Sequence, residues 1–184
     1  MKAQLFRGDL HYADVTLHTA ASGPVTALDT LWLRLEDQGV TGIGEVRLNI
    51  RYLHGYREEQ VLNNLLQILR RWDWRQAPAA RLAALDDEDC TLLPPSRMVL
   101  DMALHDLLAR QQGVSVAAWL GARDGLPAWH TNQTLFWGSE RQMLEQAQRY
   151  VVRGFTQLKL RTGVADFATD LARLQRLRQR FGQQ

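Results

Sequence analysis

A short strand near the carboxyl end limits the possible folds more than any other segment. Residues Gly154 to Gly163 read Gly-Phe-Thr-Gln-Leu-Lys-Leu-Arg-Thr-Gly, and the two-residue repeat of a strand places Lys159 and Arg161 on one face. Leu158 and Leu160 take the other face, towards covering helices, which predicts a strand of a parallel sheet or barrel. An unpaired buried cation costs several kcal/mol, so carboxylates, a bound anion or water must meet the cationic face. No strand that would supply such carboxylates is expected after this one.

The composition is that of a globular protein with one domain, or with one small domain and part of another. The chain has 184 residues, 46% of them hydrophobic, with 22 Lys and Arg against 20 Asp and Glu. A net charge of +2 predicts neither a nucleic-acid nor an acidic-membrane partner. Charges interrupt the apolar runs, so no membrane span or signal segment is expected. The single cysteine, Cys90, excludes an internal disulfide framework and fits a reducing cytoplasm, which is the predicted location.

The amino-terminal part predicts a β-meander. Apolar and polar residues alternate from Leu31 to Leu35, a turn follows at residues 37–39, and Val40 to Val46 pairs back as the next strand. Gly42 and Gly44 share one face of that strand, where another backbone can approach closely.

Two helices are predicted to follow the meander. Helical spacing marks the first over Arg57 to Arg71, and Pro94-Pro95-Ser96 opens the second, which ends at Gly113. The inner positions assigned to the first helix are Val61, Leu65, Ile68 and Leu69, and those of the second are Val99, Met102, Ala103 and Leu107.

After Pro127 the order changes to strand, helix, strand, helix, which predicts two successive βα units. The strands are expected over 131–135 and 156–161, and Ser139 with Gln142 forms a capping box for the helix between them. An apolar stripe predicts a final helix with an inner face of Phe167, Leu171, Leu174 and Phe181. The arginines at 173, 176, 178 and 180 are predicted to form its solvated face.

This order of elements resembles the enolase superfamily, in its mandelate racemase and muconate lactonizing enzyme branch. The most specific segments are Gly42-Ile43-Gly44-Glu45, the helix from Pro95 to Leu108, Trp119-Leu120-Gly121, and the Lys-x-Arg strand that begins at Gly154. The resemblance implies an α+β capping domain of strands and helices, residues 1–127. An incomplete α/β barrel segment of the TIM type, residues 128–184, would follow it with the first two βα units.

The resemblance also implies a cofactor. Members use a bound Mg²⁺ to stabilise the enediolate that forms when a base removes the proton α to a carboxylate. The carboxylates that hold the metal in the superfamily lie on the third, fourth and fifth barrel strands. We therefore expect Mg²⁺ in the complete family enzyme and none bound by this chain alone. His105 and Asp106 are interpreted as helix surface or a structural hydrogen bond rather than as metal ligands.

By the same resemblance, Lys159 and Arg161 are the candidate catalytic residues. The first lysine of the family's Lys-x-Lys lies near the substrate carboxylate, and the second is the base on one face of the α-carbon. Arg161 replaces the second lysine, and a guanidinium with a pKa above about 12 is a poor base but a good carboxylate binder. The alternative is that both cations lie on an exposed edge strand and are solvated.

Candidate substrate contacts come from the capping loops and from the first barrel strand. The loops His18 to Val25 and Asn49 to Tyr56 correspond in the family to segments that close over the barrel mouth. Plain surface residues and ordinary polar filling of a barrel mouth are the alternatives. The candidates are Tyr52, His54, Tyr56, Asn132 and Thr134.

Two functions remain open on the sequence alone. The first is the amino-terminal part of a Mg²⁺-dependent racemase, cycloisomerase or acid-sugar dehydratase that acts on a small carboxylate or hydroxy acid, with no turnover expected from this chain alone. The second is a non-catalytic interaction module, or one subunit of a split enzyme, in a homo-oligomer or with a complementing barrel subunit. A decayed fragment is a third interpretation.

Overall fold

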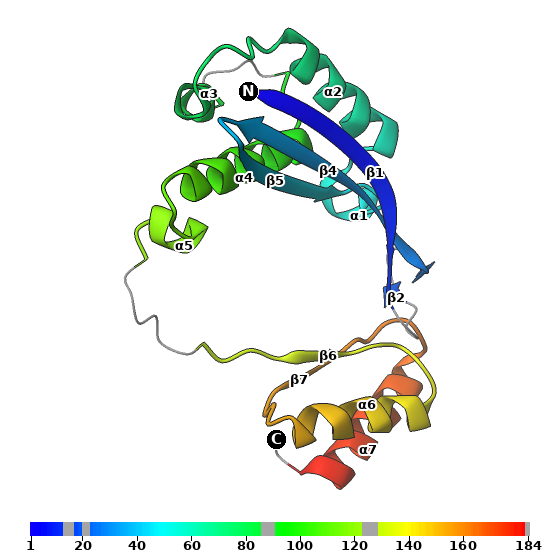
Figure 1. The fold of residues 1–184 in the computed structure, drawn as a ribbon. Helices are drawn as coiled ribbons and strands as arrows, with labels where there is room; N and C mark the ends of the chain where they lie inside the picture. Colours follow the sequence, from blue (N-terminus) through cyan, green and yellow to red (C-terminus); the bar gives the residue numbers. More distant parts are fainter. Residues whose placement is uncertain (13–16, 20–22, 86–90, 123–128, 183–184) are drawn as a thin grey trace. The chain divides into compact units, whose positions relative to one another are not determined.

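The computed structural model describes residues 1–12, 17–19, 23–85, 91–122 and 129–182, which fall into two compact units (Figure 1). The first unit comprises Met1–Leu10 and Leu28–Leu126, and the second comprises His11–Ala27 and Pro127–Gln184. The division groups the amino-terminal segment 11–27 with the carboxyl-terminal residues. Cys90 and the predicted domain boundary after residue 127 lie outside the described residues. No helix in the described ranges is long and apolar enough to cross a bilayer.

A three-stranded sheet forms the base of the first unit. Its strands, in spatial order, are β1 (Lys2–His11), β4 (Ala27–Asp37) and β5 (Val40–Arg47). Strands β4 and β5 are antiparallel, with Leu33 opposite Gly44. The turn between them places Gln38 and Gly39 in the left-handed region, with φ of 49° and 78°. This agrees with the predicted turn, because such hairpins favour residues that tolerate positive φ.

The first unit also contains helices, and the longest of them packs against β5. They are α1 (Arg51–His54), α2 (Glu58–Arg71), α3 (Pro78–Ala84), α4 (Pro94–Gln111) and α5 (Val116–Trp119). Helix α2 buries the predicted Val61, Leu65 and Ile68 in a common core with the leucines of β4. Helix α4 buries Val99, Ala103 and Leu107 as predicted. The assignment of Met102 to its inner face was wrong, because Met102 is exposed and Leu100 and Leu104 are buried instead.

The close approach predicted for Gly42 and Gly44 is present. A Cβ atom built on Gly44 would lie 1.9 Å from the carbonyl oxygen of Val99, and one on Gly42 would lie 2.4 Å from that of Ala103. Both carbonyls belong to α4, so any larger residue at these two positions of β5 would push the helix away from the sheet.

The second unit contains a hairpin and two βα units. Its elements are β2 (Leu17–Thr19), β3 (Gly23–Val25), β6 (Gln133–Leu135), α6 (Glu140–Val152), β7 (Leu158–Leu160) and α7 (Phe167–Phe181). Strands β6 and β7 are parallel and shorter than predicted, and α6 and α7 lie on the same side of them (Figure 1). The predicted capping box of Ser139 and Gln142 is present.

The core of the second unit is small. Its buried apolar members are Leu135, Met143, Ala147 and Leu177, against which Leu158 and Leu160 pack from β7. Of the inner face predicted for α7, Phe181 packs against this core, but the assignment of Phe167, Leu171 and Leu174 was wrong, because these three are exposed. The residues that α7 buries are Asp170, Arg173 and Leu177, so Arg173 does not belong to a solvated face.

Candidate functional site

Two of the predicted site residues lie side by side on the sheet of the second unit. In the parallel register of β6 and β7, Thr134 is the partner of Lys159, while Leu135 is the partner of Leu160. Paired residues of neighbouring strands point to the same face of a sheet. Thr134 and Lys159 therefore share the face opposite the leucines, and Lys159 is exposed there.

The other two predicted residues of this region lie just outside the strands. Asn132 immediately precedes β6 and is exposed, and Arg161 immediately follows β7 and is half-buried. Within the described part of the chain, the buried Nε of Arg161 has no hydrogen-bond partner. The exposed ammonium of Lys159 and the half-buried guanidinium of Arg161, two residues apart, both carry a charge that suits an anion such as a carboxylate.

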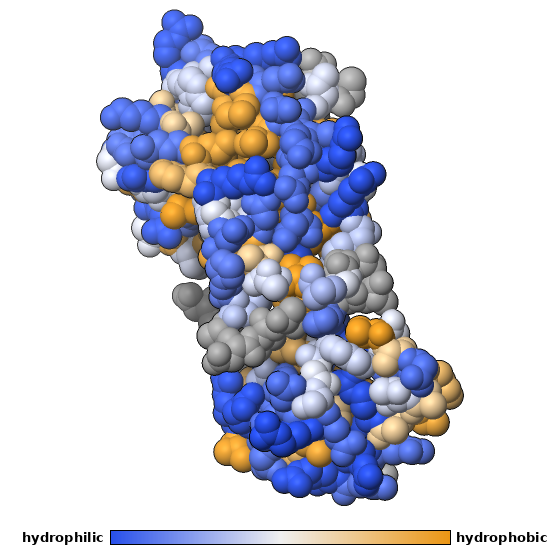
Figure 2. All heavy atoms as spheres, turned by 90° about the vertical axis from the view of Figure 1, so that its right-hand side faces the viewer, coloured by the Kyte–Doolittle hydropathy of each residue, from blue (hydrophilic) through white to orange (hydrophobic). Residues whose placement is uncertain are grey.

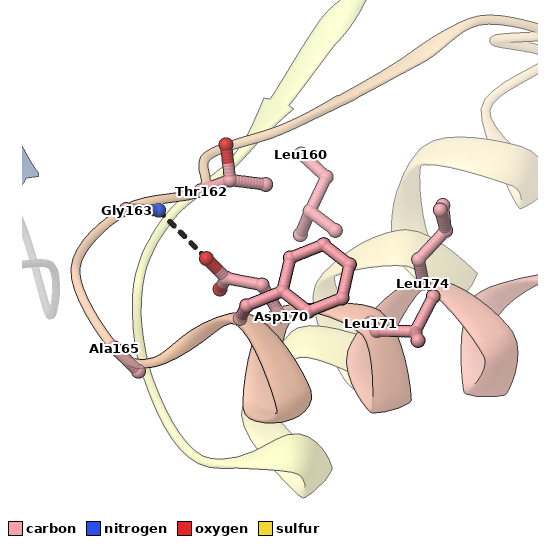
Figure 3. A pocket seen from close by; sticks show the side chains of 8 residues that line it. Leu160, Thr162, Gly163, Ala165, Asp170, Leu171 and Leu174 are labelled. Atoms are coloured by element: carbon pink, nitrogen blue, oxygen red, sulfur yellow. Dashed lines mark hydrogen bonds between the residues drawn. The ribbon is translucent and has the colours of Figure 1, made fainter.

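The loop after Arg161 is tied to helix α7. The backbone N–H of Gly163 donates to Oδ2 of Asp170 over 2.7 Å, which Figure 3 shows as a dashed line. Asp166 caps the start of α7 by accepting the backbone N–H of Thr169 over 2.9 Å. This hydrogen bond, together with one from the Thr169 hydroxyl, holds the pKa of the Asp166 carboxyl below its usual value.

Arg173 is a buried cation that the sequence analysis missed. Its guanidinium carbon lies 4.0 Å from the ring centroid of Trp137, two residues beyond β6, and its three side-chain nitrogens have no hydrogen-bond partner among the described residues. Burial lowers the pKa of Arg173, and the negative charge of Asp170 opposes that shift. The sequence did contain a signal for this position. Asp170, Arg173 and Leu177 are three and four residues apart, so a helix places all three on one face.

The predicted contacts Tyr52, His54 and Tyr56 lie in or next to helix α1 of the first unit. Tyr52 and His54 lie on α1, within a segment predicted as a loop, and Tyr52 is exposed. The backbone N–H of Tyr56 donates to Nδ1 of His54 over 3.0 Å, and the two rings lie 5.7 Å apart. The structure therefore brings His54 and Tyr56 together and pairs Thr134 with Lys159, whereas Tyr52 has neither of these partners.

A metal ion needs several ligating side chains in one place. No three His, Cys, Asp or Glu side chains in the described ranges come together in a way that would hold a metal ion. His105 and Asp106 have structural partners instead. Asp106 accepts the backbone N–H of Ile43 on β5 over 2.9 Å and pairs with Arg110, while His105 contacts the carbonyl of Asp101.

An α+β unit built on a meander, together with parallel βα units, defines a class of proteins in which a capping domain accompanies a βα barrel. The N-terminal domain of the mandelate racemase and muconate lactonizing enzyme family matches residues 12–121. The chain belongs to this family, a branch of the enolase superfamily.

Relatives of this chain are epimerases. It is 38% identical over 86 residues to an L-Ala-D/L-Glu epimerase of Francisella tularensis subsp. novicida, a match that covers 47% of this chain and 23% of that protein. Among solved structures, the substrate-liganded L-Ala-D/L-Glu epimerase of Bacillus subtilis is 26% identical, with a TM-score of 0.80, over 99% of this chain and 50% of that one.

A further solved structure shares the fold and was determined with a metal. The dipeptide epimerase of Methylococcus capsulatus, complexed with Mg and the dipeptide L-Arg-D-Lys, has a TM-score of 0.80 at 24% identity. That match covers 99% of this chain and 51% of the other. The chain therefore spans about half the length of the solved proteins that it resembles.

Proposed function

We propose that this chain supplies the capping domain, residues 1–127, and the first two βα units, residues 128–184, of a racemase-type enzyme. The enzyme would move the proton on the carbon α to a carboxylate and so epimerise a dipeptide. The observation that carries this proposal is the exposed cation of β7, Lys159, which lies beside Thr134. The chain that bears it belongs to a family in which its relatives are dipeptide epimerases.

In this proposal the two cations have different roles. Lys159 is exposed on its strand, so its ammonium is free to pair with the substrate carboxylate. Arg161 binds the same anion and does not act as the base, because a guanidinium stays protonated at any physiological pH. Proton removal on this side of the substrate would therefore be impaired relative to an enzyme with lysine at position 161.

The remaining candidates would contact the rest of the substrate. Thr134 offers a hydroxyl beside Lys159, and Asn132 offers an amide just before the start of β6. Tyr52, His54 and Tyr56 would select the side chain of the substrate from the capping domain, where aromatic rings offer both apolar surface and hydrogen bonds.

A fusion protein tests this function. The whole chain would be joined to the second half of the Bacillus subtilis epimerase and supplied with L-Ala-L-Glu and Mg²⁺ in deuterated water. We expect NMR to detect exchange of the α-proton of the Glu residue. Loss of a charged hydrogen bond predicts a fall of about 10- to 100-fold in kcat/KM for Lys159→Met. Arg161→Lys should raise the rate, since lysine can accept a proton.

Arg180→Met is the matched control for these variants, because Arg180 is an exposed cation on α7. It should leave the exchange rate unchanged. Equal rates for Lys159→Met and the unchanged fusion protein would contradict the assignment of Lys159.

A further inference from the structure

Two charged residues of helix α7 are buried in the second unit. Asp170 and Arg173 are 9% and 5% exposed. Among the described residues, neither Oδ1 of Asp170 nor any of the three side-chain nitrogens of Arg173 has a hydrogen-bond partner. On the face of the molecule drawn in Figure 2, hydrophilic residues lie at the surface of both units, which is the usual place for arginine. Buried polar groups without partners are rare in proteins, and a bound small molecule is one explanation for them.

The guanidinium of Arg173 is held by its face and leaves its edges free. Its carbon lies over the ring of Trp137, 4.0 Å from the centroid, where a cation is attracted to the aromatic face. At this distance the planar guanidinium meets the ring with its own face. The N–H bonds lie in the guanidinium plane, so the contact with Trp137 uses none of the donors. The group therefore presents a rigid fork of donors, which suits two oxygens of one planar anion.

The carboxylate of Asp170 supplies an acceptor one helical turn before Arg173. Its Oδ2 accepts the backbone N–H of Gly163 over 2.7 Å (Figure 3), whereas its buried Oδ1 accepts no hydrogen bond from the described part of the chain. Residues three positions apart on a helix are neighbours on its surface. A molecule in contact with both residues would accept hydrogen bonds from the guanidinium and donate one to the carboxylate.

These two residues lie on the side of the sheet opposite Lys159. Helix α7 packs through Leu177 on the leucines of β6 and β7, whereas Lys159 takes the other face of the strands. Asp170 lines a hollow of about 560 Å³ beside the loop at Gly163, which gives a small solute a route to this side of the helix (Figure 3). A ligand at Arg173 would therefore be separate from a substrate at Lys159.

We propose that Arg173 and Asp170 form a binding site for a small oxyanion that keeps one proton, and we take bicarbonate as this ligand. Two oxygens of bicarbonate would accept from the fork of Arg173, and its hydroxyl would donate to Oδ1 of Asp170. The negative charge of Asp170 is tolerated beside the anion because the residue lies in the first turn of α7 and accepts a backbone N–H. The burial of both residues selects a small ligand. The inference goes beyond the proposed function and does not depend on it.

Titrations followed by NMR test the site. The 184-residue chain would be titrated with sodium bicarbonate at constant ionic strength and mildly alkaline pH, while the indole N–H signal of Trp137, assigned with Trp137→Phe, is recorded. We expect a saturable shift of this signal. Sodium nitrate has the planar shape and the charge of bicarbonate but no hydroxyl. It should bind at least tenfold more weakly, because it cannot donate a hydrogen bond to the carboxylate of Asp170.

Phosphate distinguishes the two sources of this chemistry. It also carries acceptor oxygens and a hydroxyl, but at mildly alkaline pH it is larger and more highly charged than bicarbonate. We therefore expect phosphate to bind more weakly than bicarbonate. Tighter binding of phosphate would overturn the assignment of bicarbonate as the ligand.

Substitutions test each of the two residues. Arg173→Met should abolish the saturable shift, because no donor remains for the anion. The matched control is Arg176→Met, which removes an exposed cation from the same helix and should bind bicarbonate as the unchanged chain does. Asp170→Asn offers an amide N–H in place of the oxygen acceptor, so bicarbonate and nitrate should bind about equally. Circular dichroism would establish that the variants are folded.

Three results would overturn the inference. The first is the lack of a saturable shift with bicarbonate in the folded, unchanged chain. The second is equal affinity of that chain for bicarbonate and nitrate. The third is an equal loss of binding in Arg173→Met and Arg176→Met, which would indicate a general effect of charge. The titrations use neither a dipeptide nor a second polypeptide, so none of their outcomes bears on the proposed function.

Discussion

Helices α4 and α7 both carry leucines at helical spacing, but they differ in what covers them. Helix α4 lies against β5 through Val99, Ala103 and Leu107, and it also buries Leu100 and Leu104 on a neighbouring face. Helix α7 buries only Leu177 among its leucines and leaves Leu171 and Leu174 exposed. The comparison teaches that an amphipathic pattern specifies a contact surface, whereas the neighbours present decide whether that surface is buried.

The largest expected effect contrasts the two cores. Leu104→Ala should cost about 4 kcal/mol of unfolding free energy, because Leu104 is fully buried and its cavity cannot collapse against rigid neighbours. Leu177→Ala in the second unit should cost about 2 kcal/mol, the low end for such changes, since its core is small. Urea titration followed by NMR signals of each unit measures both values. Equal costs would remove the contrast between the units.

A smaller effect is expected where β5 meets α4. Gly44→Ala should destabilise the first unit by about 3 kcal/mol, because the new methyl group would overlap the carbonyl oxygen of Val99. Gly8→Ala is the control, since a Cβ there meets only the ring of Trp32, at 3.3 Å. A Gly44→Ala variant as stable as the control, by thermal unfolding, would show that α4 can retreat from the sheet.

Removal of the buried cation of the second unit is expected to raise the free energy of unfolding, whereas the substitutions above lower it. Arg173→Met should stabilise that unit by about 1 kcal/mol, because an apolar side chain of similar length avoids the desolvation of an unpaired charge. Arg176→Met is the control on the same helix, where the arginine is exposed and lies 3.6 Å from Glu140. Should Arg173→Met destabilise the unit instead, the contact of the guanidinium with Trp137 and its attraction to Asp170 must outweigh the cost of burying the charge.

The smallest effect is a pH dependence at the start of α7. The pKa of Asp166 is lower in the folded state than in the unfolded state. The ionised carboxylate therefore stabilises the folded state fully at a pH above the unfolded pKa of about 3.9, and this stabilisation is lost as the pH falls through the folded pKa. Asp166→Ser keeps a capping oxygen that does not titrate, so the variant should lose less α7 helicity below about pH 4. Circular dichroism against pH measures this, with Glu59→Gln in the first unit as the control. Identical acid titrations of Asp166→Ser and the unchanged chain would argue against the cap.

Local patterns predicted much of the fold. The alternation from Leu31 to Leu35, the turn at Gly39 and the capping box of Ser139 each depend on residues close together in sequence, and the structure has all of them. The close approach at Gly42 and Gly44 was also foreseen, because an absent side chain on one strand face leaves room for a backbone.

Long-range packing decided the features that the sequence did not reveal. Met102 and Leu104 are both apolar residues of α4, and only the position of the neighbouring elements determines which is buried. Helical spacing places Arg173 on the same face of α7 as Asp170 and Leu177, but it does not reveal that the guanidinium meets Trp137, 36 positions earlier in the chain. The pairing of Thr134 with Lys159 likewise required the register of two separate strands.

The hydrogen bond from Gly163 to Asp170 has a consequence for regulation. Asp170 lies in the first turn of α7, so a constraint on the start of this helix also constrains the turn two residues after Arg161. Order at the start of α7 and the orientation of the guanidinium are then thermodynamically coupled, so an anion held by Arg161 would stabilise the helix start as much as a stable helix start strengthens the binding of that anion.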